Sequence, residues 1–125
     1  SKSTEAAITS RTRAMHVSHM INLTGQILPV RDIVRMARRH GIPVWCGGML
    51  ESGVGRAHNV ALASLPNFTL PGDTSPSERY WEKDIVTPEW TMDRDGMMKV
   101  PVDRPGLGVT LNEEVVTRYL VSESV

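Results

Sequence analysis

The stretch Gly41-Ile42-Pro43-Val44-Trp45-Cys46-Gly47-Gly48-Met49-Leu50-Glu51-Ser52-Gly53 decides the fold class of this sequence. Residues 42–46 form a short apolar run bounded by proline and glycine, which is the pattern of a strand buried on both faces of a sheet. The glycines that follow indicate a loop, because glycine permits backbone angles and close approaches that a Cβ atom would block. The stretch therefore predicts a buried strand that ends in a glycine-rich loop.

Helices are predicted on both sides of this stretch. Apolar residues recur at helical spacing over 30–40, arginines occupy the other face, and Gly41 follows as a C-terminal cap. A second helix is predicted over about 54–65, ended by Pro66-Asn67, and 68–70 forms a second short strand. The order helix, strand, helix, strand with short connections is typical of parallel α/β architecture, so the predicted fold class is α/β.

The two ends of the chain are less regular. Residues 1–29 show no sustained helical or strand period. We expect a helix near 4–15, and Met20-Ile21-Asn22-Leu23-Thr24 fits either a short strand or a loop. Residues 85–111 alternate short apolar runs with proline and glycine, which predicts an extended, turn-rich segment.

Three local signals lie in the second half of the chain. Ser75-Pro76-Ser77-Glu78 predicts a capping box that opens a single helical turn. Asp95-Gly96 indicates a hairpin. Asn112-Glu113-Glu114 predicts the capped start of a last helix that runs to about Leu120.

Composition limits the classes of partner and the cellular location. The 125 residues could hold one modest core and at most one domain. With 14 Lys and Arg against 14 Asp and Glu, the formal net charge is zero, which argues against a nucleic-acid or acidic-membrane partner. No apolar stretch approaches the roughly 20 residues that span a bilayer, and no apolar signal core follows Ser1, so we expect a cytoplasmic protein. A single cysteine excludes an intramolecular disulfide, and the missing initial Met suggests a fragment or a processed chain.

Four stretches carry a resemblance to a known family: the opening stretch extended through Val54-Gly55-Arg56-Ala57-His58-Asn59, then Asn67-Phe68-Thr69-Leu70-Pro71-Gly72-Asp73-Thr74-Ser75, Arg79-Tyr80-Trp81 and Pro105-Gly106-Leu107-Gly108-Val109. In this order and spacing they resemble the C-terminal part of enolase-superfamily enzymes of the o-succinylbenzoate synthase and N-acylamino-acid racemase group. The resemblance implies the C-terminal portion of a TIM-type (β/α) barrel, whose active site lies at the C-terminal ends of the strands. The implied domains are a poorly matching segment over 1–29, the last barrel β/α units over 30–84, and a turn-rich C-terminal extension over 85–125.

The resemblance also implies the chemistry of the group. A divalent metal, usually magnesium, is held by three carboxylates and stabilises an enolate after a lysine removes a proton, and two lysines serve as acid and base. The metal carboxylates and the first lysine pair correspond to strands that would precede residue 1. The second lysine corresponds to Thr24 in a gapped comparison and lies near His19 in an ungapped one, so neither comparison recovers a lysine. We therefore predict no catalytic residue and no metal ligand in this chain, and we expect the chain alone to be inactive.

Six residues are implied as substrate-binding by their position in the family: Gly47, Gly48, Met49, Leu50, Asp73 and Tyr80. The first four would line the pocket at the mouth of the seventh barrel strand, with Asp73 at the end of the eighth strand and Tyr80 in the loop after it. Leu50 and Tyr80 are then expected to face a shared cavity, because parallel strands bring their following loops to the same end. The alternative is a tight turn with an ordinary core Met and Leu.

Other chemistry-bearing residues have structural interpretations. For Glu51 and Asp73 we prefer a structural role over an acid–base pair or metal ligands, because the family puts its metal elsewhere. Cys46 is flanked by apolar residues, so we expect an inert thiol rather than a nucleophile. Gly53-Val54-Gly55-Arg56 matches a structural turn of the family, although a helix start of this kind could also bind an anion. The four histidines have no metal-ligand spacing.

These inferences lead to a functional hypothesis and two alternatives. We expect the chain to contribute pocket loops and barrel closure to a metal-dependent enzyme, either an o-succinylbenzoate synthase of menaquinone biosynthesis or an N-acylamino-acid racemase. The first alternative is a non-catalytic, truncated descendant that acts as a small folded module or an assembly partner, and the second is a small anion-binding domain. The expected partner is a small carboxylate substrate in the intact enzyme, with no nucleic acid and no membrane, and a homo-oligomer is an open expectation.

Overall fold

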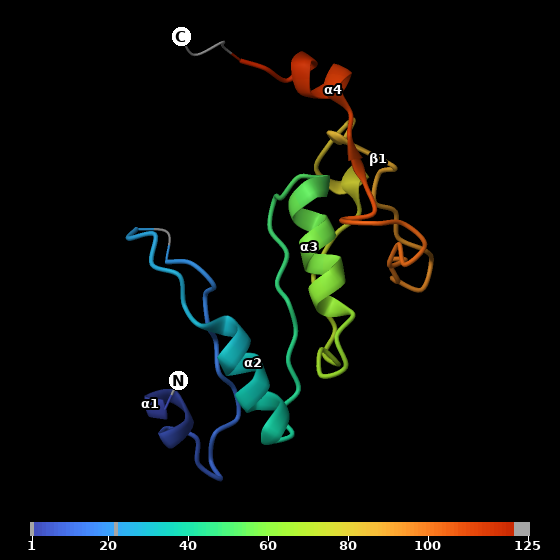
Figure 1. Cartoon of the computed structure of the whole chain (residues 1–125). Coiled ribbons are helices and arrows are strands. Elements are labelled where there is room, and N and C mark those ends of the chain that lie inside the picture. Colours follow the sequence, from blue (N-terminus) through green and yellow to red (C-terminus); the bar gives the residue numbers. More distant parts are fainter. Residues whose placement is uncertain (1, 22, 122–125) are drawn as a thin grey trace. The chain divides into compact units, whose positions relative to one another are not determined.

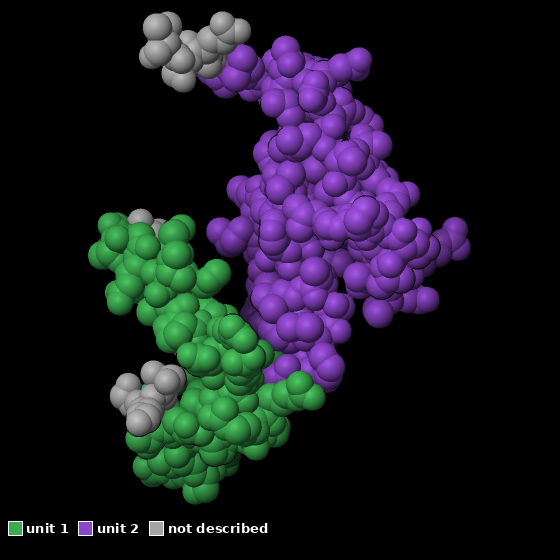
Figure 2. Space-filling view, in the orientation of Figure 1, with its two compact units in different colours: residues 1–44 green, residues 45–125 purple. Residues whose placement is uncertain are grey.

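A computed structural model describes residues 2–21 and 23–121. The chain divides into two compact units, Ser1–Val44 and Trp45–Val125, which Figure 2 shows in different colours. The division falls inside the apolar run over 42–46, which adopts extended backbone, so no change in composition marks it.

Unit 1 contains two helices, α1 (Lys2–Ala6) and α2 (Val30–Arg39) (Figure 1). The helix predicted over 30–40 is confirmed to within one residue at its end. Its buried side is made of Ile33, Met36 and Ala37. Gly41 follows with a φ of 63°, the left-handed conformation expected of a glycine that ends a helix.

The helix predicted near 4–15 is wrong beyond Ala6, where α1 ends. The next residues form a turn held by threonine hydroxyls. The Thr9 N–H donates to Thr12 Oγ1 at 3.0 Å, and the Arg11 N–H donates to Thr9 Oγ1 at 3.3 Å. Such hydroxyls offer the backbone partners that compete with helical hydrogen bonds, so the helix stops early.

The segment around Gly25 is a tight turn rather than a strand. A single antiparallel bridge joins Met20 to Ile27, and Gly25 has a φ of 68°. Asn22, part of the strand considered from the sequence, lies outside the described residues. Thr24, which stands where the family comparison requires a lysine, therefore lies in a turn.

Unit 2 is built around α3 (Gly53–Ala63), with extended chain before and after it (Figure 1). The helix predicted over 54–65 is confirmed to within two residues at each end. The strands predicted at 42–46 and 68–70 form no strand ladder within the described residues, and Leu70 lies in a bend. A strand needs a neighbour whose N–H and C=O groups pair with its own, and no described segment supplies that ladder.

The C-terminal segment holds two short strands and a helix. β1 (Val86–Thr87) and β2 (Thr110–Leu111) pair antiparallel. They are followed by α4 (Glu113–Arg118), whose capped start is confirmed because the Val115 N–H donates to Asn112 Oδ1 at 3.3 Å.

The hairpin signal at Asp95-Gly96 marks a tight turn. The Asp93 N–H donates to the Met97 carbonyl at 3.0 Å, and Gly96 has a φ of 78°. No strand flanks this turn in the part of the chain that the structure describes, so the turn is confirmed and the hairpin is not.

The capping box predicted before the short 3₁₀ helix η1 (Ser77–Arg79) is wrong. Pro76 is the N-cap residue, and no side chain caps the turn. The Ser75 hydroxyl donates to the Asp73 carbonyl at 3.4 Å instead. The predicted single turn exists, but Ser77 is buried and its hydroxyl bonds to the interior of unit 2.

The core of unit 2 joins α3 to the C-terminal segment. Ala57 and Val60 of α3 pack with Val86 and Trp90, and partly buried apolar residues surround them. The turn-rich extension therefore supplies half of this core. None of the helices in the described part of the chain is long and apolar enough to cross a membrane.

Candidate functional site

Two extended segments of unit 2 lie side by side, one before α3 and one after it. A Cβ atom on Gly48 would lie 3.0 Å from Thr74 Cα, and one on Gly72 would lie 3.1 Å from the Cys46 carbonyl. Cys46 is thus beside Gly72 and Gly48 is beside Thr74, so the two segments run in the same direction. This is the direction that the parallel α/β prediction requires, and the approach leaves no room for a side chain at Gly48.

Residues 47–49 form what we call the glycine loop, and two carboxylates hold it in place. The Gly48 N–H donates to Asp73 Oδ1 at 2.5 Å, and the Met49 N–H donates to Glu51 Oε2 at 2.6 Å. Glu51 Oε1 also accepts a hydrogen bond from Asn59 Nδ2 at 3.1 Å, which fixes the loop to α3. Bonds of N–H groups to carboxylates are stronger than neutral ones, so both acids act as structural supports of the loop.

The structure brings part of the predicted substrate site together. Gly47 lies in the same loop as Gly48 and Met49, and Asp73 joins the loop through its carboxylate. The Met49 side chain is 77% exposed, so it is not an ordinary core methionine. The loop residues and Asp73 are therefore neighbours, whereas their contact with a substrate stays a prediction.

Leu50 and Tyr80 are both exposed, by 66% and 41%. Leu50 follows the glycine loop directly, and Tyr80 is the C-cap residue of η1. A cavity of about 610 Å³ in unit 2 is lined by other residues, Cys46 and Thr74 among them. The cavity that Leu50 and Tyr80 are expected to share stays a prediction.

A buried charge network joins the glycine loop to the rest of unit 2. The Arg56 side chain is fully buried, and its Nη2 donates to the Glu51 carbonyl at 2.9 Å. Its Nη1 donates to Asp84 Oδ2 at 3.2 Å and to Ser77 Oγ at 3.3 Å. Its Nε lies 4.0 Å from Glu51 Oε1 and has no hydrogen-bond acceptor among the described residues. The buried cation therefore depends on Asp84, because an unpaired charge is costly in the interior.

Asp84 is the centre of this network. Its Oδ1 accepts hydrogen bonds from the Gly53 and Ile85 N–H groups, both at 2.8 Å. Its Oδ2 accepts from Ser77 Oγ at 2.6 Å and from Arg56. Four donors thus meet one carboxylate, which lies at the start of α3, where the helix dipole also favours a negative charge.

The start of α3 has no room for another residue than glycine at position 53. A Cβ atom there would lie 2.1 Å from Val86 Cγ2, and the Trp90 Nε1 donates to the Gly53 carbonyl at 2.8 Å. The Gly53 N–H already donates to Asp84. Gly53-Val54-Gly55-Arg56 is therefore a structural turn, and the first N–H that a bound anion could use is occupied.

From the sequence, Ser77 was expected only as part of a capping box, and Asp84 and Trp90 were assigned no role. Arg56 was considered only as part of the family stretches and of the turn Gly53-Val54-Gly55-Arg56. The available signal was an acidic residue next to the apolar pair Ile85-Val86. That signal indicates a buried acid but not its partner, which stands 28 positions earlier in the chain.

Cys46 behaves as the inert thiol that the sequence suggested. Its Sγ lies 3.6 Å from Asn59 Oδ1, and the residue is half-buried. Burial, followed by the negative charges of Glu51 and Asp73, raises the pKa of the Cys46 thiol. A raised pKa leaves little thiolate at neutral pH, which disfavours a nucleophile.

The described residues do not fit the magnesium site of the family. No group of three His, Cys, Asp or Glu side chains that could hold a metal ion occurs over 2–21 and 23–121. The acids nearest the loop, Glu51 and Asp73, bind backbone N–H groups instead.

This chain is similar in sequence to known proteins over most of its length. The sequence matches the family model described as Enolase C-terminal domain-like over residues 10–115, which includes most of the segment 1–29. The o-succinylbenzoate synthase of Geobacillus stearothermophilus is 50% identical over 99 residues, which cover 79% of this chain and 26% of that protein. The N-succinylamino acid racemase of Amycolatopsis sp is 54% identical over 97 residues, with 74% and 26% covered. The chain thus spans about a quarter of the length of these curated relatives.

Solved structures agree with the sequence matches. A crystal structure of an enolase-superfamily member from Listeria innocua Clip11262 superimposes with a TM-score of 0.69 at 46% identity, covering 78% of this chain and 26% of that one. An enolase-superfamily member of unknown function from Enterococcus faecalis V583 gives a TM-score of 0.67 at 42% identity, covering 76% and 25%. The resemblance inferred from the sequence is confirmed, and the chain belongs to the Enolase C-terminal domain-like family, whose α/β fold it shares.

Proposed function

We propose that this chain is the C-terminal part of the barrel of an enolase-superfamily enzyme and contributes its glycine loop to the substrate pocket. The observation that supports this most is the pair of extended segments that run in the same direction and are joined where Gly48 donates to Asp73. In (β/α) barrels the active site is built from the loops at the C-terminal ends of the strands. The glycine loop follows the extended run over 42–46 at that end.

The hydrogen bonds of the glycine loop suggest separate roles for its backbone and its side chains. The N–H groups of Gly48 and Met49 are bound to carboxylates, so they set the shape of the loop. The exposed side chains of Met49 and Leu50 would then form an apolar wall for the substrate's acyl group or side chain, with Tyr80 opposite. Asp73 Oδ2, which has no hydrogen bond among the described residues, would accept one from the substrate.

The intact enzyme would act on a small carboxylate. The two activities proposed are the formation of o-succinylbenzoate and the racemisation of N-succinylamino acids, after the names of the relatives. Both need an enolate stabilised by positive charge. The metal of such an enzyme would be held by residues other than the described ones, so the role proposed for this chain is to shape the pocket and orient the substrate.

A pair of chimeras tests this role. In the first, residues 30–115 of this chain replace the matching segment of the Geobacillus stearothermophilus synthase, which keeps the strand where the resemblance places the second lysine. In the second, residues 10–115 replace it and bring in Thr24. We expect magnesium-dependent o-succinylbenzoate formation from the first chimera and none from the second. A folded but inactive first chimera would refute the pocket role, and turnover by this chain alone would refute the assignment of the catalytic groups to other residues.

The non-catalytic alternative is favoured by one observation. Thr24 lies in a turn closed by the bridge between Met20 and Ile27, so this region offers neither the lysine nor the strand of the family. A small folded module should run as a single discrete species in size-exclusion chromatography with light scattering. A piece of barrel with unpaired strand edges should instead self-associate.

A further inference from the structure

The charge of the chain is divided unevenly between its two units. Residues 1–44 carry seven Lys and Arg against two Asp and Glu, a formal charge of +5, whereas residues 45–125 carry seven against twelve, a formal charge of −5. Six of the seven cations in unit 1 are arginines. The zero net charge, which argued against a nucleic-acid partner, is therefore the average of two opposite units.

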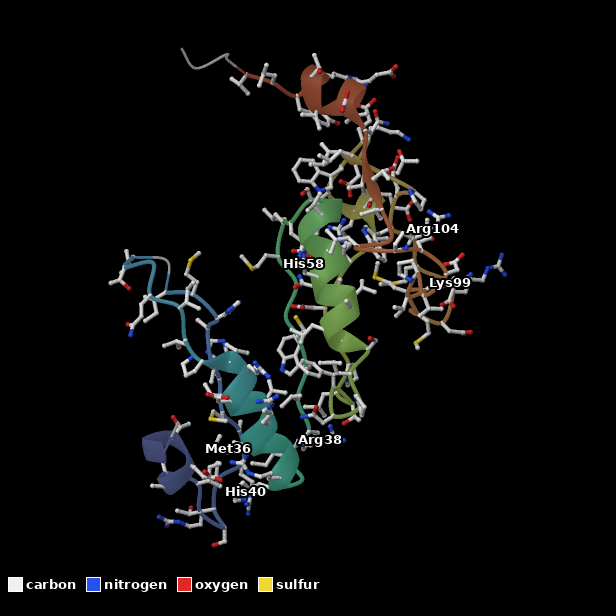
Figure 3. The ribbon with its side chains drawn as sticks, in the orientation of Figure 1. Met36, Arg38, His40, His58, Lys99 and Arg104 are labelled. Atoms are coloured by element: carbon white, nitrogen blue, oxygen red, sulfur yellow. The ribbon has the colours of Figure 1, made fainter. Side chains whose placement is uncertain are left out.

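Three arginines form a stripe along the exposed side of α2: Arg31, Arg35 and Arg38. At about 100° per residue they fall within about 60° of the helix circumference. The buried residues of α2 lie on the opposite side, and Figure 3 labels Met36 and Arg38 on opposite sides of the helix. We call these three residues the arginine stripe.

The arginine stripe is not neutralised by neighbouring side chains. Its side chains make no hydrogen bond or ion pair with any residue over 2–21 and 23–121. Unit 1 contains two acidic residues, Glu5 and Asp32. Glu5 is bound by Arg39 at 2.9 Å and by His40 at 3.3 Å, and Asp32 makes no ion pair among the described residues. The positive charge of the stripe is therefore available to a partner.

The spacing of the stripe fits a row of phosphates. An α-helix rises about 1.5 Å per residue, so the stripe is about 10 Å long. One strand of B-DNA carries a phosphate about every 3.4 Å along its axis, which places about three phosphates beside three arginines. The planar guanidinium also matches phosphate oxygens through two parallel N–H groups. We infer that the arginine stripe of α2 binds the phosphate backbone of a nucleic acid.

Two other classes of partner fit the stripe less well. A helix that lies in a membrane surface inserts its apolar face into the lipid, whereas Ile33, Met36 and Ala37 of α2 are buried in the folded chain. The acidic unit of a second copy would offer carboxylates, but several of these, such as Glu51 and Asp84, are already bonded inside unit 2. At 0.1 M ionic strength charges more than about 10 Å apart are largely screened, so the affinity of the stripe for phosphate depends mainly on the charges close to it.

Binding of the full chain to a labelled 20-base-pair DNA duplex, followed by fluorescence anisotropy, tests the inference. Three phosphate contacts predict a slope of about −2.7 for log K against log salt, a loss of about 40-fold in affinity between 50 and 200 mM salt. A labelled single strand should give a slope of about −2.1. Binding should not depend on base sequence, because phosphate contacts carry no sequence information.

A matched pair of variants locates the site. R31Q/R35Q/R38Q should reduce the slope to near zero, whereas R79Q/R94Q/R104Q, which removes the same charge from exposed arginines of unit 2, should bind like the unsubstituted chain. The absence of duplex binding at 50 mM salt, or an equal loss in both variants, overturns the inference. Binding to anionic lipid vesicles without binding to the duplex, or self-association in sedimentation velocity that needs the stripe, also overturns it. If a variant fails to fold, the slope of log K against log salt for the unsubstituted chain still tests whether three phosphates are contacted.

Discussion

The two units of this chain differ in where they place arginine side chains. In unit 1 three arginines stand on the exposed side of α2 without an ion pair among the described residues, whereas in unit 2 Arg56 is fully buried and meets Asp84. Water solvates an exposed cation at little cost, but a buried one must be matched by an acid and by hydrogen-bond acceptors. An arginine therefore marks a binding surface in one unit and an internal support in the other, and its surroundings decide which.

The largest effect should come from removing the buried cation. Arg56→Ala leaves the Asp84 carboxylate buried without its ion pair, and we expect the free energy of unfolding of unit 2 to fall by about 3 to 5 kcal/mol. Arg38→Ala on α2 should change stability by no more than about 0.5 kcal/mol. Tryptophan fluorescence in urea follows unit 2, because all three tryptophans lie there, and far-ultraviolet circular dichroism follows the helices of both units. If Arg56→Ala and Arg38→Ala lowered the free energy of unfolding equally, the contrast between the buried and the exposed arginines would be wrong.

A smaller effect should come from a single methyl group at the same network. Gly53→Ala places a Cβ atom 2.1 Å from Val86 Cγ2, and we expect it to destabilise unit 2 by about 1 to 3 kcal/mol. Gly47→Ala is the matched control, because its Cβ would only reach ordinary contact, 3.8 Å from the Trp45 ring. Urea unfolding of both variants measures the difference. A Gly53→Ala protein as stable as its control would show that the network tolerates a shift of the helix start.

The smallest effect belongs to the exposed acid of unit 1. Hydrogen bonds from Arg39 and then from His40 hold the pKa of Glu5 below 4.5. Because the folded pKa is lower than the unfolded one, these bonds stabilise unit 1 at pH values above 4.5, and the stabilisation is lost as the pH falls through the folded pKa. An NMR titration of the Glu5 carboxyl carbon should give a midpoint below 4.5 that rises in Arg39→Gln and not in Arg79→Gln. A midpoint at 4.5 or above in the unsubstituted chain would contradict this.

Local patterns predicted α2, α3 and the start of α4 well, but not the end of α1. The apolar period over 30–40, the glycine-rich start of the helix near 54, and the Asn112 cap all correspond to observed helices, because each depends on residues within a turn or two. The strands at 42–46 and 68–70 depend on neighbouring strands that the described chain does not supply. The apolar runs and the residues that end them predicted chain outside helices at both places, but the hydrogen bonding of that chain could not be predicted.

The candidate site shows the same limit. The family resemblance placed Gly48 and Asp73 in one site, and the structure joins them by a hydrogen bond. The resemblance could not show that the Arg56 side chain is buried, because its burial depends on contact with Asp84, far along the chain. The zero net charge was a poor guide to the partner for a similar reason. A sum over 125 residues conceals how charge is divided between the two units.

The distance along the chain between Gly53 and Asp84 has a consequence for synthesis. The two residues are 31 positions apart, and a ribosome adds about 5 to 20 residues per second. Asp84, whose carboxylate accepts the Gly53 N–H, is therefore added about 2 to 6 seconds after Gly53. Until Asp84 is added, Arg56 must stay hydrated, so the interior of unit 2 cannot close before that point of synthesis. Unit 1 differs, because Glu5, which pairs with Arg39 of α2, has already left the ribosome when α2 emerges.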